Sequence, residues 1–214
     1  MKIILLGAPG SGKGTQSSLI EEKFNIPKIS TGDMLRQAIK DKTKIGSQVA
    51  QIIASGQLVS DEVVIDLLKE RLSKPDCKNG YILDGFPRTA TQAKSLANNN
   101  IDINFIIELK ADKEEIIKRI SGRRIHKESG RTYHIKYNPP KQEGLDDITQ
   151  EKLITRKDDE KETVINRIKI YEQESAQMIN YYKEINQKII QIDGNKTAQE
   201  INSEINSIIK KSTK

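Results

Sequence analysis

A glycine-rich segment that ends in lysine follows directly on a short apolar run near the start of the chain. The run covers residues 3–6, IILL, and the segment covers residues 7–13, GAPGSGK. An apolar run without alternation is typical of a strand that is buried on both faces, with helices packed on each side. The turn after it aims backbone N–H groups inward, and the next helix adds its positive dipole end. The pattern therefore predicts a phosphate-binding loop in an α/β fold.

Lys13 indicates which kind of phosphate ligand this loop takes. Its ammonium is a point charge that can reach the outer phosphates of a nucleoside triphosphate. The general pattern continues with Ser or Thr directly after the lysine, whereas here Gly14 follows and the hydroxyl comes at Thr15. The loop predicts triphosphate binding and leaves the reaction open. The residues expected to bind the phosphates are Gly10, Ser11, Gly12, Lys13, Gly14 and Thr15.

Apolar runs and helical patterns alternate along the rest of the chain. Further strands are predicted at residues 26–29, 81–83, 105–109 and 188–192. The main helices are predicted at residues 15–24, 61–72, 112–121, 161–183 and 197–210. Apolar strands that alternate with helices indicate a parallel sheet covered on both faces, which is the α/β class.

Two stretches depart from this alternation. Residues 30–59 carry only helical patterns, and residues 122–159 are polar, contain several glycines and prolines, and show no long period. Such a long irregular segment is uncommon in a compact domain, and loops of this kind are often lids. We therefore expect a core with two inserts. The core is formed by residues 1–29, 60–121 and 160–214, and the inserts are residues 30–59 and 122–159.

The composition disfavours several classes of protein. The 214 residues carry a formal net charge of +6, but aromatic residues make up only 4% and tryptophan is absent, whereas a nucleic-acid binder needs stacking aromatics. The single cysteine, Cys77, forms no internal disulfide and fits a reducing compartment. No apolar segment approaches the roughly 18 residues of a membrane span. We expect a soluble cytoplasmic protein whose lysine-containing tail, Lys210, Lys211 and Lys214, is solvated.

Asp84 is a candidate metal-binding residue. It ends the apolar strand predicted at residues 81–83, and near a phosphate loop a carboxylate in that position can hold Mg²⁺. Mg²⁺ takes few protein ligands and keeps several waters, so Asp84 is expected to act through water. The next residue is glycine, and Asp-Gly is also a common turn.

Seven short motifs resemble those of the adenylate kinases. They occur in the right order over nearly the whole chain, and the late hydroxyl of Thr15 is itself a feature of that family. The motifs are GAPGSGKGT (7–15), STGDMLR (30–36), LDGFPRT (83–89), GRRIH (122–126), RTYH (131–134), NPP (138–140) and TRKDD (155–159). The resemblance implies a P-loop kinase fold, with residues 30–59 as a nucleotide-monophosphate-binding insert and residues 122–159 as a lid.

The resemblance implies a reaction and a set of site residues. The reaction is the reversible, Mg²⁺-dependent transfer of the terminal phosphoryl group of ATP to AMP, giving two ADP and serving adenine nucleotide homeostasis. The implied donor-side residues beyond the loop are Arg119, Arg123, Thr132, Tyr133, His134 and Lys196. The implied acceptor-side residues are Thr31, Arg36, Gln57, Leu58, Val59, Gly85, Phe86, Pro87, Arg88, Gln92, Arg156 and Arg167. The implied catalytic residues are Lys13, Arg88, Arg123, Arg156 and Arg167.

The lid is expected to lack zinc. Many members of the family hold four cysteines in the lid, and the positions here that match them look like His126, Ser129, Asp146 and Thr149. One imidazole, one carboxylate and two hydroxyls make a poor structural zinc site. The resemblance therefore points to the long-lid, hydrogen-bonded type found in bacteria.

Alternatives remain within and outside this family. A GTPase switch would need an Asn-Lys-x-Asp motif, but residues 195–198 read NKTA. Within the same fold, a GTP:AMP phosphotransferase is an alternative donor choice, and a UMP/CMP kinase is an alternative acceptor choice. Thr31 favours AMP, because UMP/CMP kinases usually have alanine at the matching position. A monomer is expected, since one chain holds both substrates in one cleft.

Overall fold

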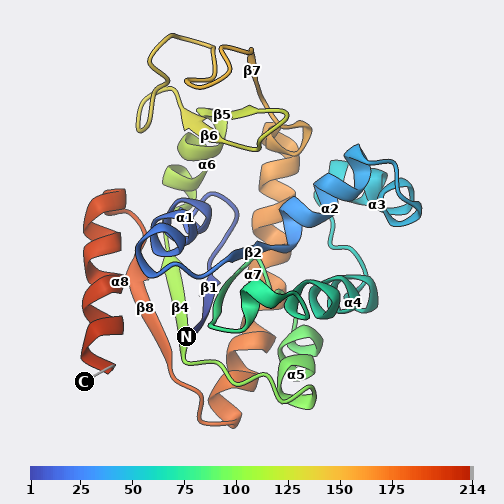
Figure 1. Cartoon of the computed structure of the whole chain (residues 1–214), viewed down its shortest axis with the longest axis vertical. Coiled ribbons are helices and arrows are strands. Elements are labelled where there is room, and N and C mark those ends of the chain that lie inside the picture. The colour runs from blue at the N-terminus through green and yellow to red at the C-terminus, as the bar shows by residue number, and fades with distance from the viewer. Residues whose placement is uncertain (213–214) are drawn as a thin grey trace.

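A five-stranded parallel sheet forms the centre of the protein (Figure 1). The computed structural model describes residues 1–212, so Lys214 of the predicted tail lies outside the described residues. The strand order is β2-β3-β1-β4-β8, which places the first strand of the chain in the middle of the sheet. The strands are β1 (Lys2–Leu6), β2 (Lys28–Ser30), β3 (Tyr81–Asp84), β4 (Phe105–Lys110) and β8 (Ile189–Asp193).

Helices cover both faces of this sheet. The side chains of β1 alternate between the two faces: Ile3 and Leu5 pack toward α1 and α8, whereas Ile4 and Leu6 pack toward α4, α5 and α7. Both sets are almost fully buried, which explains why the strand reads as a continuous apolar run. These helices are α1 (Lys13–Phe24), α4 (Asp61–Leu72), α5 (Ala90–Asn98), α7 (Lys161–Glu184) and α8 (Ala198–Ser212). The α/β class and the parallel sheet are confirmed.

Two excursions leave the core on the side where the strands end. The first contains α2 (Thr31–Lys40) and α3 (Lys44–Ala54). Ser30 caps the start of α2, and its Oγ accepts a hydrogen bond from the N–H of Asp33 (3.3 Å). The second follows α6 (Lys113–Ser121) and lies at the top of Figure 1. It holds a small antiparallel sheet of β5 (Arg123–His126), β6 (Thr132–His134) and β7 (Leu153–Ile154), in the order β6-β5-β7.

The structure corrects the sequence-based expectation in two places. Residues 122–159, expected to be irregular, contain this three-stranded sheet as well as the short 3₁₀ helix η2 (Lys157–Asp159). Its strands have two to four residues, which is too short for an apolar period to show. Helix α5 was not expected either, because only Ala93, Leu96 and the polar Gln92 face inward from it.

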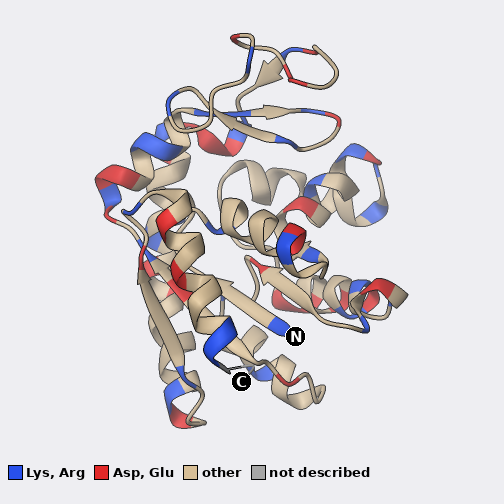
Figure 2. Cartoon of the chain, turned by 60° about the vertical axis from the view of Figure 1, so that its left-hand side comes forward, with Lys and Arg blue, Asp and Glu red and all other residues tan. Residues whose placement is uncertain are grey.

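Charge is distributed over the outside of the molecule rather than in the central sheet. Figure 2 shows lysine, arginine, aspartate and glutamate along the outer helices and the small sheet of β5, β6 and β7, called the lid sheet below, while the central strands are mostly uncharged. No helix within residues 1–212 is long and apolar enough to cross a membrane.

A second 3₁₀ helix, η1 (Pro75–Cys77), leads into β3 and contains the buried thiol of Cys77.

Candidate active site

The glycine-rich loop lies between the end of β1 and the start of α1, as its sequence predicts. Gly10 and Gly12 have φ angles of 83° and 100°, a region that favours glycine. A Cβ on Gly10 would also come within 2.7 Å of Ile120, so the loop packs closely on α6. At Gly14, by contrast, a Cβ would meet only Asp84 at an ordinary 3.7 Å. The unusual glycine after Lys13 is therefore not required by the backbone of this structure.

Lys13 points back into its own loop. Its Nζ donates hydrogen bonds to the carbonyl oxygens of Gly7 (2.6 Å) and Ala8 (2.9 Å). Removal from water lowers its pKa to about 8, although the nearby carboxylate of Asp84 opposes that change. The lowered pKa means that the buried ammonium has too little negative charge near it. An anionic ligand would supply that charge and raise the pKa again.

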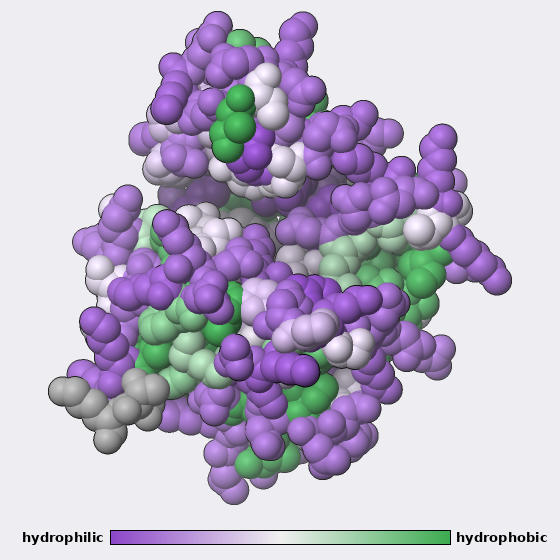
Figure 3. All heavy atoms as spheres, viewed as in Figure 1, coloured by the Kyte–Doolittle hydropathy of each residue, from purple (hydrophilic) through white to green (hydrophobic). Residues whose placement is uncertain are grey.

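A large cleft opens above this loop. It has a volume of about 1480 Å³ and extends from the loop to the lid sheet on one side and to α2 on the other. Figure 3 shows it as a hollow beneath the upper lobe of the molecule. Predicted donor-side residues that line it are Gly10, Gly12, Lys13, Gly14, Thr15, Arg119, Arg123, Thr132, Tyr133, His134 and Lys196. Ser11, the remaining predicted residue of the loop, is fully buried and does not line the cleft.

A smaller pocket adjoins this cleft at the base of α2 and α3. The structure brings nine of the predicted acceptor-side residues together there. They are Thr31, Arg36, Gln57, Leu58, Val59, Gly85, Arg88, Gln92 and Arg167. Pro87 and Arg156 line the large cleft instead, whereas Phe86 is fully buried in the core, and its side chain does not face the pocket.

Hydrogen bonds fix the wall of the smaller pocket around Gly85. Its carbonyl oxygen accepts from the hydroxyl of Thr31 (2.9 Å) and from Nε of Arg88 (2.8 Å). Gln92 supports the same turn: its Oε1 accepts from the N–H of Arg88 (2.8 Å), and its Nε2 donates to Asp61 (2.8 Å). Asp61 is thus a supporting residue that sequence reasoning missed, because it reads only as the start of a helix.

Five arginines gather between the loop and this pocket, and burial leaves them short of hydration. Removal from water, together with the neighbouring Arg167 and Arg36, lowers the pKa of Arg88 to about 10. Burial likewise lowers the pKa of Arg156 to about 10, with Arg36 and Arg123 adding to the effect. Arg88 and Arg156 remain charged at neutral pH. Like charges held this close create a strong binding site for a multivalent anion.

Three aspartates hold four of these arginines in place, and sequence reasoning did not assign them to the site. Arg167 contacts Asp158 at 2.8 Å, and Arg123 forms a two-point pair with Asp159, with Nε at 2.8 Å. Asp33 contacts Arg36 at 2.6 Å and Arg156 at 3.6 Å. Counting Lys13 and Asp84, six cations face four carboxylates, so the site keeps an excess of positive charge. Asp158 and Asp159 are the last two residues of the TRKDD motif, so the sequence did contain a signal for these two.

Asp84 lies at the end of β3, beside the glycine-rich loop. It ends β3 next to Leu5 of β1, is 8% exposed, and lines the large cleft. Its Oδ2 accepts a hydrogen bond from the hydroxyl of Ser17 (3.3 Å). A carboxylate that faces an open cleft beside the phosphate loop fits Mg²⁺, which binds one or two carboxylates and keeps its waters.

Arg119 and His134 lie at the outer end of the donor side. Arg119 donates to the carbonyl oxygens of Gly194 (2.7 Å) and Lys196 (3.4 Å) and pairs with Glu115 (2.8 Å). The Nδ1 of His134 accepts from two backbone N–H groups, and burial lowers the pKa of the ring. The ring is therefore neutral, and it packs so closely on Gly122 that a Cβ there would come within 2.3 Å of it.

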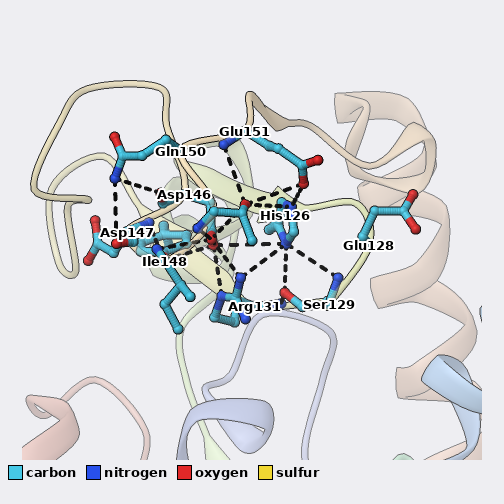
Figure 4. Close-up of polar contacts among 12 residues, drawn as sticks. His126, Glu128, Ser129, Arg131, Asp146, Asp147, Ile148, Gln150 and Glu151 are labelled. Atoms are coloured by element: carbon cyan, nitrogen blue, oxygen red, sulfur yellow. Dashed lines mark hydrogen bonds and ion pairs between the residues drawn. The ribbon is translucent and has the colours of Figure 1, made fainter.

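The four positions of residues 122–159 that are expected to match family cysteines are joined by hydrogen bonds (Figure 4). His126 contacts the hydroxyls of Ser129 (2.7 Å) and Thr149 (3.2 Å), and Thr149 donates to Asp146 (3.1 Å). Asp146 also receives two bonds from Arg131 (2.8 and 2.6 Å). Among residues 1–212, no group of three or more His, Cys, Asp or Glu side chains could hold a metal ion.

Comparison with protein-family models gives a match over most of the chain. The model described as adenylate kinase matches residues 5–187. The matched region contains the glycine-rich loop, both excursions, the arginine cluster, the end of β1 and all of β2, β3 and β4, and it ends before β8 and α8.

Proposed function

This chain belongs to the adenylate kinase family, and on that premise we propose that it transfers the terminal phosphoryl group of ATP to AMP, giving two ADP. Family membership already makes it a nucleoside monophosphate kinase. Transfer between two bound nucleotides rests on the site, and one observation carries it: a loop for a triphosphate and a second pocket open on the same arginines, Arg36, Arg88 and Arg167. Thr31, which lines the second pocket, favours AMP as the acceptor.

The reaction needs alignment and charge compensation more than covalent chemistry. The transferred group spreads negative charge over its oxygens, and the acceptor is a phosphate oxygen that is already anionic. Arg88 and Arg167 face the acceptor pocket, while Lys13 and Arg123 face the donor side. Guanidinium groups grip phosphate oxygens in pairs. Because Asp158 and Asp159 hold Arg167 and Arg123 in place, little reorganisation is needed when the phosphates arrive.

We assign Mg²⁺ to the donor phosphates, with Asp84 as the residue that holds it through water. When bound, the ion would neutralise charge on the phosphates. The Ser17 hydroxyl orients the Asp84 carboxylate for this role. Replacing Asp84 with asparagine should raise the Mg²⁺ concentration needed for half-maximal activity while the thermal midpoint changes little. An unchanged Mg²⁺ requirement would remove Asp84 from the metal site.

Water must be kept from the transferring group, since it competes as an acceptor. We infer that residues 122–159 close over the cleft as a lid and that residues 30–59 close over the acceptor, as independent inserts on the core. Closure of the adenylate kinase lid is itself a standard example of such gating.

The hydrogen bonds around Asp146 support a lid that keeps its shape without metal. Stoichiometric zinc in the purified protein would contradict this, and a dimer in sedimentation would contradict the proposed monomer.

The deciding experiment measures ADP formation with purified protein and pairs of nucleotides. ATP with AMP should give two ADP for each AMP consumed, and omission of AMP should abolish turnover. The donor is then changed to GTP, and the acceptor to UMP or CMP. Faster turnover with GTP than with ATP would assign GTP as the donor. Faster turnover with UMP or CMP than with AMP would assign that nucleotide as the acceptor. No turnover with any pair would contradict the proposal.

A further inference from the structure

Two ion pairs join the two inserts in the part of the chain that the structure describes. The first, between Asp33 and Arg156, lies deep in the site at 3.6 Å. The second lies at the rim: Nζ of Lys40 contacts Oε2 of Glu128 at 2.6 Å and the Glu128 carbonyl oxygen at 3.5 Å. Lys40 is the last residue of α2, and Glu128 lies in the turn between β5 and β6. They are 88 residues apart in sequence.

The rim pair spans the opening of the cleft. Lys40 and Glu128 both line the large cleft, from opposite inserts. Figure 4 shows Glu128 pointing away from the hydrogen-bonded cluster around His126, so its carboxylate does not serve the internal structure of the lid. The hydrogen bond from Lys40 lowers the pKa of Glu128, so the carboxylate is ionised well below neutral pH. The contact is therefore a charged bridge between two segments that otherwise enclose the cleft.

We propose that Lys40 and Glu128 form a latch that holds the lid against the acceptor-side insert and must break before a nucleotide enters or leaves. Because the pair joins the two inserts directly, we expect the latch to act whether or not a nucleotide is bound. Both side chains are partly exposed, at 37% and 56%. Exposed ion pairs are weak and screened by salt, so we expect a roughly two- to fivefold effect on the ratio of closed to open molecules.

Four variants test the latch. Lys40→Met and Glu128→Gln each remove one charge, and the double variant removes both. Exchange of the two charges, Lys40→Glu with Glu128→Lys, should re-form the pair. Lys44→Met and Glu143→Gln are matched controls, since these exposed residues lie in the same two inserts and change the net charge equally.

The primary measurement is a distance distribution between two spin labels, which needs no turnover. Labels on cysteines that replace the exposed Gln48 and Gln142, in a Cys77→Ser background, report the separation of the inserts. At about 10 mM ionic strength, each single variant should lower the closed-to-open ratio two- to fivefold. The double variant should lower this ratio no further than either single variant, and the charge exchange should restore it. At about 1 M salt the differences should vanish. Distributions like those of the controls, or additive single effects, would overturn the latch.

Nucleotide release is the second measurement. A fluorescent N-methylanthraniloyl ADP is bound and then displaced by excess ADP at low salt. Lys40→Met and Glu128→Gln should release it two- to fivefold faster than the Lys44→Met and Glu143→Gln controls. Equal release rates would show that the pair does not gate the cleft. Failure of either test leaves the proposed phosphoryl transfer untouched, because ADP formation is measured separately.

Discussion

At the scale of single residues, burial of charge decides how this site works. Lys13, Arg88 and Arg156 lose water without gaining enough opposite charge, and each has a lowered pKa for that reason. Asp33 shows the reverse: Arg36 and Arg156 hold its pKa at about 2 despite its burial. The site is thus prepared to receive phosphate, and the same charges are unfavourable until it arrives.

Arg88 provides the sharpest test at this scale. Arg88→Ala should lower kcat/KM for AMP by about 10³-fold or more, because the guanidinium faces the acceptor pocket and would stabilise the transferring group. Its loss relieves buried positive charge, so the thermal midpoint should change little. Steady-state kinetics and thermal unfolding measure the two effects. Arg124→Ala is the matched control, since Arg124 bonds only backbone carbonyls, at Ser121 and Arg123. Activity retained in Arg88→Ala would refute the role of Arg88.

Lys13 predicts proton uptake when a triphosphate binds. Its pKa is lowered to about 8 in the free protein, so above that pH the amine is mostly neutral. Phosphate oxygens favour the charged form and raise the pKa, so binding at pH 9 should take up a substantial fraction of one proton, and affinity should fall as pH rises above 8. Calorimetry in two buffers of different ionisation enthalpy measures the uptake. The Lys13→Arg variant should show no such proton uptake, because arginine does not titrate in this range. Uptake equal to that of the unchanged protein would mean that another group takes up the proton.

At the scale of elements, the proposed lid depends on one buried carboxylate. Asp146 is inaccessible to solvent and accepts hydrogen bonds from Arg131, Tyr133 and Thr149, with Arg131 as the largest cause of its strongly lowered pKa. A lowered pKa means that this contribution to stability is complete above the unfolded value near 3.8 and is lost only as pH falls further. The lid sheet has strands too short to be stable alone.

Asp146→Asn should loosen the lid and leave the core intact. The amide cannot accept all of these bonds as a carboxylate does, so buried donors in the lid lose partners. Hydrogen exchange followed by mass spectrometry should show about tenfold faster exchange over residues 122–154, with unchanged exchange in β1 and β4. Asp147→Asn is the control, because the Asp147 carboxylate accepts only from the N–H of Lys141. Uniform change across the chain would mean that the lid is not an independent unit.

At the scale of the whole molecule, the core extends beyond the part that matches the family model. The match ends at residue 187, but β8 pairs with β4 and α8 covers one face of the sheet. Ile205 of α8 is fully buried against this face. Because the P-loop begins where β1 ends, any loss of this packing also affects the base of the site.

Truncating Ile205 should therefore destabilise the entire protein. Ile205→Ala removes buried methyl groups and leaves a cavity, which costs about 2–5 kcal/mol of unfolding free energy. Urea denaturation measures the loss, and Ser203→Ala on the exposed side of the same helix should cost far less. A midpoint equal to that of Ser203→Ala would mean that α8 is not part of the cooperative core.

The sequence by itself determined the α/β class, the central strands and the loop at Lys13, because these features are local: an apolar run, a turn rich in glycine, and a helical period. Only the tertiary structure decided the lid sheet, the support of Arg88 by Gln92, and the aspartates that hold Arg123, Arg156 and Arg167. The same holds for the contact of Lys40 with Glu128. These features join residues far apart in the chain, and an ion pair or a two-residue strand leaves no periodic signal until the fold brings its partners together.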